Sequence, residues 1–265
     1  MKKTLIIILF LLMAYLLPQA SHDRDWTDDQ KKLSYIEIEN NQVSITNVRS
    51  NTYRSTDDYD VDYYDLDFNL DDIVSVDYVV EPFGTFGAAH ALLSFGLESG
   101  EYFSVSVEIR KEKGESFNPI KGLLKQYELV YVIADERDVI DLRARHRKDN
   151  VYLYPTTATP DQAQKLFLDI TQRVQKIYEQ PEFYNTITNA CTTNIVRHVN
   201  NISDEKDIRF DPRIILPGNS DELALELGFL NTDLPIAGAR QKYRINEHIE
   251  NCDPTSDGYS ACIRK

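Results

Sequence analysis

Hydrophobic and polar residues alternate with a period of two through the first part of the chain, a pattern that predicts β-strands. Residues 34–39 and 43–48 alternate on either side of Asn40-Asn41, a pair typical of a tight hairpin turn. Residues 59–70 and 73–80 continue the alternation, and residues 129–133 form another apolar segment between two short helical patterns. We therefore predict that strands dominate the first half of the chain.

A second hairpin is predicted over residues 88–110, with a turn at Glu98-Ser-Gly100. Gly100 suits the left-handed position that a three-residue loop requires. If Leu97 pairs with Glu101, one face of the hairpin is entirely apolar. The other face then carries five polar residues: His90, Ser94, Ser104, Ser106 and Glu108. This register places His90 opposite Glu108, with Cβ atoms about 5 Å apart. An ordinary solvated sheet face would give the same pattern.

Helices are expected in the second half of the chain. Thr159-Pro-Asp-Gln162 has the residues of a capping box, and apolar residues at helical spacing follow as far as Ile177, before Pro181. A last short helix is predicted over residues 220–227, ended by Gly228. Strands that lead and helices that follow predict an α+β fold, with an antiparallel sheet packed against helices.

The N-terminus has the features of an export segment. Lys2 and Lys3 precede thirteen apolar residues, 5–17, whereas a membrane-spanning helix needs about 20. We interpret residues 1–22 as a signal peptide or an N-terminal anchor, and residues 23–265 as one domain. The protein is therefore expected to be exported to the periplasm or cell envelope.

Net charge and residue spacing limit the partners and cofactors that the sequence predicts. Its 43 acidic residues against 29 basic ones give a formal net charge of −14, so nucleic acid is not an expected partner. No group of histidine, cysteine and acidic residues has the spacing of a metal site, and no cofactor motif is present. We expect neither a metal nor a cofactor.

Three cysteines in an exported chain indicate one disulfide and one free thiol. Cys252 and Cys262 enclose a short polar loop and are expected to pair. Cys191 remains, at the start of a helical pattern that Thr188 or Asn189 is positioned to cap. The positive end of a helix dipole favours a thiolate there. A small buried hydrophobic residue is the alternative interpretation.

A cysteine nucleophile needs a base within hydrogen-bonding distance and a group that orients this base. His198 lies about two turns, or 10 Å, further along the helix that carries the cysteine. His146 falls in a charged helix end, where a solvated surface role is expected. His90 has a carboxylate opposite it, so the sequence predicts Cys191 as nucleophile, His90 as general base and Glu108 as the orienting residue.

An ordered series of motifs runs through nearly all of the chain after the export segment. The motifs are Asp23-Arg-Asp-Trp26, Asn47-Val-Arg49, Glu81-Pro-Phe83, Ala89-His-Ala-Leu-Leu-Ser-Phe95, Val107-Glu-Ile-Arg110, Tyr127-Glu-Leu-Val-Tyr-Val132, Asp135-Glu-Arg-Asp138, Phe183-Tyr-Asn-Thr186, Thr188-Asn-Ala-Cys-Thr-Thr193 and Leu216-Pro-Gly-Asn-Ser-Asp221. Together they resemble the N-terminal extracytoplasmic domain of Lnb-type proteins. The resemblance implies a circularly permuted papain-like fold. It also implies a thioester acyl-enzyme on Cys191, as in the acyl transfer to lipoproteins that is associated with Lnb.

The chain departs from the usual Thr-Asn-Asn-Cys motif of this family, because Ala190 replaces the second asparagine. As a hypothesis, Asn185 or Asn189 would supply the missing oxyanion donor. The leading expectation is a cysteine-dependent acyl-transfer enzyme that acts on an acyl-bearing lipid or lipoprotein. A cysteine peptidase or cell-wall amidase, and a non-catalytic ligand-binding domain, are the alternatives. Peripheral or N-terminally anchored association with a membrane is also expected.

Overall fold

An eight-stranded sheet forms the centre of the computed structural model, which describes residues 19–84, 87–203 and 207–265. Seven strands follow the order β1-β2-β9-β8-β7-β6-β10, and β5 pairs with β2. The pairs are antiparallel except β2 with β9, which are parallel. The strands are β1 (Tyr35–Glu39), β2 (Gln42–Arg49), β5 (Tyr63–Asn69), β6 (Ile73–Pro82), β7 (Ala89–Leu97), β8 (Tyr102–Arg110), β9 (Glu128–Asp135) and β10 (Tyr152–Pro155). A separate two-stranded sheet pairs β3 (Thr52–Tyr53) with β4 (Tyr59–Asp60).

Both predicted hairpins are confirmed. Asn40 and Asn41 turn β1 into β2 with φ angles of 49° and 71°, left-handed values that asparagine tolerates better than most residues. Gly100 has a φ of 87° in the turn between β7 and β8. The pairing of these two strands runs from Leu92 with Ser106 to Gly96 with Tyr102, which is the register that the apolar alternation predicts.

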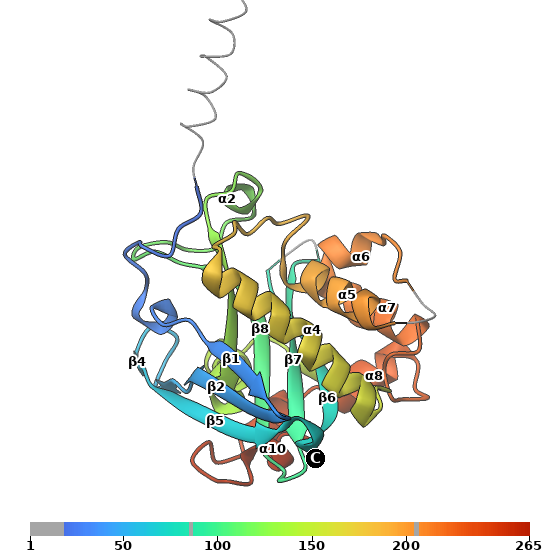
Figure 1. Cartoon of the computed structure of the whole chain (residues 1–265). Coiled ribbons are helices and arrows are strands. Elements are labelled where there is room, and N and C mark those ends of the chain that lie inside the picture. Colours follow the sequence, from blue (N-terminus) through green and yellow to red (C-terminus); the bar gives the residue numbers. More distant parts are fainter. Residues whose placement is uncertain (1–18, 85–86, 204–206) are drawn as a thin grey trace, which may run out of the picture.

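Two long helices cover one face of the sheet, α4 (Pro160–Glu179) and α5 (Cys191–Ile202). They lie side by side in front of the strands in Figure 1 and contact each other. The capping box of α4 is confirmed, because the N–H of Gln162 donates to Thr159 Oγ1 and the N–H of Thr159 donates to Gln162 Oε1. Apolar side chains of α4, α5 and the sheet form the larger hydrophobic core.

The opposite face of the sheet is covered as well, which rules out the alternative of an ordinary solvated sheet face. Ser94, Ser104 and Ser106 are fully buried there. A second core lies on this side and joins Leu92 to residues of α3 (Glu136–Asp141), which leads into a π-helical turn, η3 (Leu142–His146). The polar residues of this face have the pattern of a solvated surface because the covering segment, α3 and η3, is itself partly polar. Its arginines supply the ionic partners that buried polar groups need.

The chain continues beyond the helix that was predicted to be the last. The remaining helical elements are η1 (Asp28–Gln30), η2 (Leu70–Asp72), α2 (Pro119–Leu123), α6 (Pro212–Ile215), η4 (Pro217–Asn219), α7 (Ser220–Glu226), α8 (Ile236–Tyr243), α9 (Asn246–Ile249) and α10 (Tyr259–Cys262). The predicted helix is α7, and Gly228 follows it with a φ of 76°. The three helices after α7 are short or only weakly amphipathic, so their pattern gave no signal.

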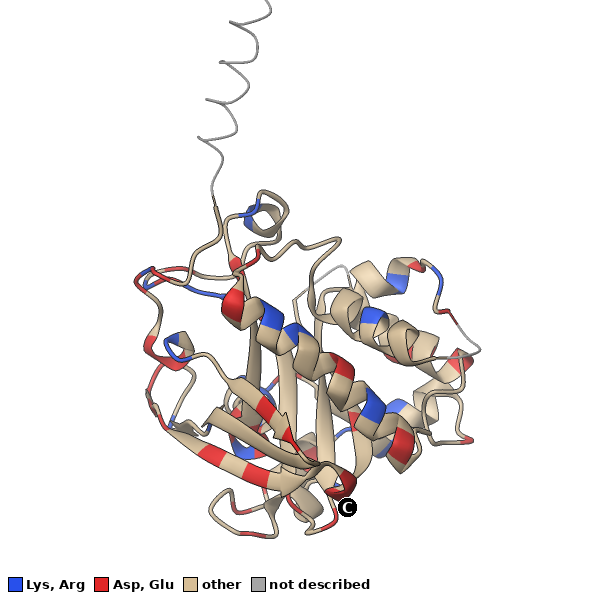
Figure 2. Cartoon of the chain, in the orientation of Figure 1, with Lys and Arg blue, Asp and Glu red and all other residues tan. Residues whose placement is uncertain are grey.

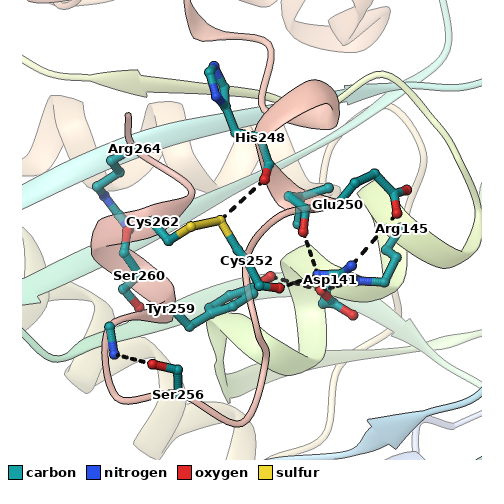
Figure 3. Close-up of a disulfide and its surroundings, with 12 residues drawn as sticks. Asp141, Arg145, His248, Glu250, Cys252, Ser256, Tyr259, Ser260, Cys262 and Arg264 are labelled. Atoms are coloured by element: carbon teal, nitrogen blue, oxygen red, sulfur yellow. Dashed lines mark hydrogen bonds and ion pairs between the residues drawn. A yellow bond between two sulfur atoms is a disulfide. The ribbon is translucent and has the colours of Figure 1, made fainter.

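The predicted disulfide between Cys252 and Cys262 is confirmed (Figure 3). It fixes the C-terminal segment, in which Tyr259 donates to Asp141 of α3 and Arg145 of η3 donates to the Cys252 carbonyl. Arg264, near the C-terminus, forms ion pairs with Glu136 of α3 and Asp77 of β6. The segment thereby holds the polar cover against the second face of the sheet.

No helix among residues 19–84, 87–203 and 207–265 is long and apolar enough to cross a membrane. The apolar segment 5–17 lies outside these ranges. Its assignment as a signal peptide or an anchor, and the boundary of the domain at residue 23, therefore stay predictions.

Candidate functional site

Cys191 is the first residue of α5, as the helical pattern predicts, but the cap differs from the expected one. Ala190 is the N-cap, and its N–H donates to Thr193 Oγ1 over 2.8 Å. Asn194 Nδ2 donates to the Ala190 carbonyl, also over 2.8 Å. Asn189 does not cap the helix because its backbone pairs with Asn185 in the preceding turn. The prediction of a Thr188 or Asn189 cap was wrong.

Cys191 is a free cysteine that takes part in no disulfide. It is buried, with 7% of the residue exposed. Burial raises its pKa, and this effect outweighs the hydrogen bonds from the backbone N–H groups of Ala91, Thr192 and Cys191 itself, which lower it. Sγ also lies 3.6 Å from Thr192 Oγ1. The helix start does surround the sulfur with amide donors, as expected, but the thiol at rest is neutral rather than a thiolate.

His90 and Glu108 come together through a third residue, Ser106. The imidazole Nε2 lies 2.7 Å from Ser106 Oγ, which donates to Glu108 Oε1 over 2.8 Å. Since the hydroxyl gives its proton to the carboxylate, it accepts the proton of Nε2–H. The unprotonated nitrogen is then Nδ1. Sequence reasoning missed this role of Ser106, although the residue stands on the same strand face as the other two.

Arg143 of η3 fixes the carboxylate end of this chain of hydrogen bonds. It donates to Glu108 Oε1 over 2.9 Å and to Glu81 Oε2 over 2.7 Å. Burial acts to raise the pKa of Glu108, but the positive charges of Arg143 and Arg49 hold it well below its usual range. Burial, together with Arg143, lowers the pKa of His90 to about 3. The imidazole is therefore neutral at physiological pH.

The thiol and the imidazole reach the first residues of β7 from different sides. Cys191 packs in the core that contains Ala91, on the α5 face of the sheet. His90 contacts Ser106 and Arg143 on the η3 face. Pairing of β7 with β8 begins only at Leu92, so both groups stand at the end of the strand pair. Within the described ranges, no hydrogen bond joins the thiol to the imidazole; the amide of Ala91, the residue that follows His90, acts to lower the pKa of the thiol.

Residues 59–218, more than half of the chain, match the family model described as the Lnb N-terminal periplasmic domain. The chain belongs to this family. The matched range contains His90, Glu108 and Cys191, and the family places the protein outside the cytoplasm, as an exported, periplasmic protein. No curated protein and no solved structure matches the chain.

The two asparagines proposed as oxyanion donors are used elsewhere in this Lnb N-terminal periplasmic domain. Asn185 Oδ1 accepts from the N–H groups of Ile187 and Thr188, and its Nδ2 donates to the Leu123 carbonyl. Asn189 Nδ2 donates to the Phe183 carbonyl. Both side chains shape the loop before Cys191. The donors that do approach the sulfur are backbone amides, which no side-chain motif reveals.

A cavity of about 540 Å³ lies between β6, α4, α5 and α7 in this domain, and its lining includes Thr192, the residue after Cys191, but not Cys191 itself. Its wall near the thiol is polar and includes Thr192, Tyr78 and Ser220, of which Tyr78 donates to Ser220 Oγ over 2.8 Å. The remainder is mostly apolar, with lining residues that include Leu93, Leu166, Ile195, Val199, Ile202, Ile208, Ile214, Leu223, Leu227 and Leu230. The volume is within the range of small-molecule sites, about 300–1,000 Å³.

His198 holds α5 in place and is too far along the helix to serve the thiol, as its spacing indicated. Its Nδ1 lies 2.6 Å from Asp169 Oδ2 on α4, and its Nε2 lies 2.8 Å from the Tyr131 hydroxyl on β9. Burial lowers the pKa of His198, so the ring is neutral. These two bonds join both helices to the sheet and thereby fix the orientation of the helix that presents Cys191.

Proposed function

We propose that this periplasmic protein is an acyl-transfer enzyme that holds a fatty acyl group as a thioester on Cys191, with the acyl chain in the cavity between α4, α5 and α7. The observation that carries the proposal is the position of this cavity. Its lining includes Thr192, whose hydroxyl lies 3.6 Å from the sulfur, and most of its other lining side chains are apolar. An acyl chain attached to the sulfur needs an apolar cavity of this kind within reach.

The lining of the cavity favours an acyl chain over a peptide. Buried amide groups of a peptide cost about 1–3 kcal/mol each when they lack hydrogen bonds. Most of the lining side chains, such as Ile195, Val199 and Leu223, offer none, and side chains with hydrogen-bonding groups, such as Thr156 and Gln162, are the minority. Each methylene of an acyl chain instead gains about 0.8 kcal/mol on burial. Acyl transfer is therefore better supported than the peptidase or amidase alternative.

The reaction would proceed in two steps. The Cys191 thiol loses its proton as Sγ attacks the ester carbonyl; the S–C bond forms, the ester C–O bond breaks and the leaving alcohol takes a proton. An amine or water then attacks the thioester and releases the acyl group. The amides of Ala91 and Cys191, which act to lower the pKa of the thiol, are the proposed donors to the oxyanion.

His90 is the proposed acceptor of the thiol proton. Ser106 holds the proton of the ring on Nε2, which leaves Nδ1 as the basic nitrogen. Ala91, the next residue along β7, bonds the thiol. The pairing with β8 stops at Leu92, so β6 alone holds the backbone of His90. A local movement of this strand end is therefore part of the proposal, because ring and thiol lie toward different faces. The movement must also take the ring out of its buried position near Arg143, since burial and Arg143 hold the pKa of His90 at about 3, too low for a base.

A non-catalytic acyl-binding protein is the second candidate, and the buried, neutral thiol favours it. Such a protein would use the cavity and leave Cys191 as a packing residue. The two candidates agree on the ligand and differ only in whether a covalent bond forms. One experiment with two readouts separates them.

The test incubates the purified protein with p-nitrophenyl esters of acetate, octanoate and palmitate, and measures ester cleavage together with intact mass. The proposal expects an acyl adduct on Cys191 that hydroxylamine removes, longer chains reacting faster, and no adduct in Cys191→Ala. Val199→Trp fills the cavity and should suppress the long-chain adduct, whereas the exposed Tyr178→Trp on α4 should not.

Other outcomes have distinct meanings. Equal binding of a fluorescent fatty acid by the wild type and Cys191→Ala, with no adduct in either, would establish the binding protein instead. Cleavage of peptidoglycan stem peptides that depends on Cys191, with no activity on the esters, would support the amidase. An adduct that forms equally well in Val199→Trp would contradict the role of the cavity.

A further inference from the structure

Apolar side chains gather on the outside of the molecule around α2. Ile120 is 64% exposed and Leu124 61%, the largest exposures of any aliphatic side chain among the described residues. Three further apolar residues with exposures between 42% and 45% lie in the same region. We call this set the α2 rim: Phe117, Ile120, Leu123, Leu124 and Ile187. Monomeric proteins seldom leave such a group in water without a function.

The α2 rim is a fixed part of the fold. Asn118 caps α2, accepting from the N–H of Ile120 over 2.9 Å and from the N–H of Lys121 over 3.2 Å. Gly122 packs so closely on the loop after α4 that a Cβ would lie 2.4 Å from Thr186 Oγ1, and that hydroxyl donates to the Pro119 carbonyl. The buried side of the helix is thus a glycine and backbone groups, and the apolar side chains face outward.

The charge around the rim differs from the charge of the whole chain. Residues 117–126 contain Lys121 and Lys125 and no acidic residue, in a protein of net charge −14. Figure 2 shows basic colour on α2, whereas bands of acidic colour mark β1 and β5. Apolar side chains with lysines beside them are the combination that binds the interface of an anionic bilayer.

The chain reaches the described part of the molecule at this same end. The first described residues run beside α2 in Figure 1, and the N–H of Ser21 donates to Glu128 Oε1, at the start of the strand that follows α2. The apolar segment 5–17 precedes them directly in the sequence. As the anchor that is one of its two predicted roles, this segment would hold the start of the described chain, and with it the rim, next to the lipid surface.

We propose that the α2 rim inserts into the interfacial region of a bilayer that contains anionic phospholipid, and that Lys121 and Lys125 contact the head groups. The protein is thereby oriented with the start of α5 toward the membrane, since the loop that carries Ile187 contacts α2 and runs directly into Cys191. The docking does not depend on any chemistry at Cys191, so it goes beyond the proposed enzymatic function.

The test places a fluorescent reporter on the rim of the full chain. Ile120→Trp is compared with Val74→Trp, a matched change at an exposed apolar residue of β6 that is 39% exposed. The native Trp26 is buried and is subtracted as a common background. Both variants are bound to vesicles of phosphatidylcholine and phosphatidylglycerol, with and without brominated acyl chains. Both carry the same N-terminal segment, so binding through that segment alone affects them equally.

Insertion of the rim predicts that bromine quenches the reporter at position 120 at least about twofold more than the one at position 74, with a blue shift on binding. Lys121→Glu combined with Lys125→Glu should reduce the difference. Equal quenching at both positions would overturn the proposal. Cys191→Ala should leave the result unchanged, and a failure of thioester formation would not affect it, so the two proposals fail separately.

Discussion

The His90 imidazole lies 3.9 Å from the Glu108 carboxylate, measured from Nε2 to Oε1. This distance is too long for a direct hydrogen bond, and the Ser106 hydroxyl lies between the two groups and bonds both. The predicted pair of a base and its orienting carboxylate is therefore a three-residue chain. Its two ends, His90 and Glu108, are buried on the second face of the sheet, so the pKa of each differs between the folded and the unfolded protein.

Acid should destabilise the protein partly through His90. Burial lowers the pKa of His90 to about 3, whereas an unfolded histidine titrates near 6.5. Below pH 6.5 the unfolded state binds a proton that the folded state does not, so stability falls as pH falls between about 6.5 and 3. At pH 5 the loss from this group is about 2 kcal/mol relative to pH 7. Urea unfolding at both pH values measures it.

His90→Gln is the control for this pH dependence, because it removes the titrating group and keeps a polar side chain. The difference in unfolding free energy between pH 7 and pH 5 should shrink in the variant. Glu108, whose pKa is held low, also contributes acid sensitivity, but only below its unfolded pKa near 4.5. An unchanged pH dependence in His90→Gln would contradict the buried, neutral state of the ring.

Two serines on β8 should respond differently to the same substitution. Ser106→Ala leaves the buried Nε2–H of His90 without a partner, and we expect a loss of about 1–3 kcal/mol. Ser104 is equally buried, but its Oγ has no hydrogen-bond partner among the described residues. Ser104→Ala should therefore be neutral or stabilising. Thermal or urea unfolding of both variants tests the difference, and equal losses would exclude the relay through Ser106.

Arg143 should be among the most sensitive positions for stability. Its guanidinium pairs with Glu81 and Glu108, and Arg143 and Glu81 are almost completely buried. Arg143→Gln removes the shorter ion pair of Glu81, which then keeps only the longer one with Arg147, and the ion pair between Arg143 and Glu108, so we expect a loss of about 3–5 kcal/mol. Arg54 makes comparable pairs on the surface, and Arg54→Gln should cost at most about 1 kcal/mol. Urea denaturation provides the comparison; similar losses would show that Arg143 is not buried with its partners.

The reactivity of Cys191 gives a direct test of its environment. Burial raises the pKa of the thiol, so the thiolate fraction at pH 7.5 is smaller than that of a free cysteine. Iodoacetamide should label the native protein at least about tenfold more slowly than the protein in urea, since both pKa and access oppose the reaction. Mass spectrometry of the alkylated peptide measures the rates. Faster labelling of the native form would instead support an activated thiolate, which the position at the start of the helix predicts by itself.

Loss of the disulfide should loosen the C-terminal cover of the sheet. The bond closes a loop with a sequence separation of 10, and chain entropy then gives about 2–3 kcal/mol of stability. The double variant Cys252→Ser and Cys262→Ser should lose this amount in urea unfolding. Amide exchange should increase in the segment around Tyr259, which the bond fixes against Asp141 (Figure 3). Dithiothreitol should reproduce the effect in the wild type and leave the double variant unchanged.

The sequence by itself determined the local elements and much of the pairing. Alternation with a period of two sets the register of β7 and β8, because a slip by one residue would turn the apolar face toward the wrong side. That register alone brings His90 near Glu108. The cap at Thr159 and the pairing of Cys252 with Cys262 follow from local chemistry in the same way. These features depend on neighbours within a few residues or on one strand pair.

Only the tertiary structure decided what covers each face of the sheet. The polar face of β7 and β8 has the pattern of a solvated surface, but Arg143 from a distant turn neutralises Glu108 and buries it. The start of α5 predicts an activated thiol, yet the packing of the helix on Ala91 buries Cys191 and raises its pKa. Burial and charge pairing join residues far apart in the chain, and periodicity contains no information about which distant segment will pack on a given face.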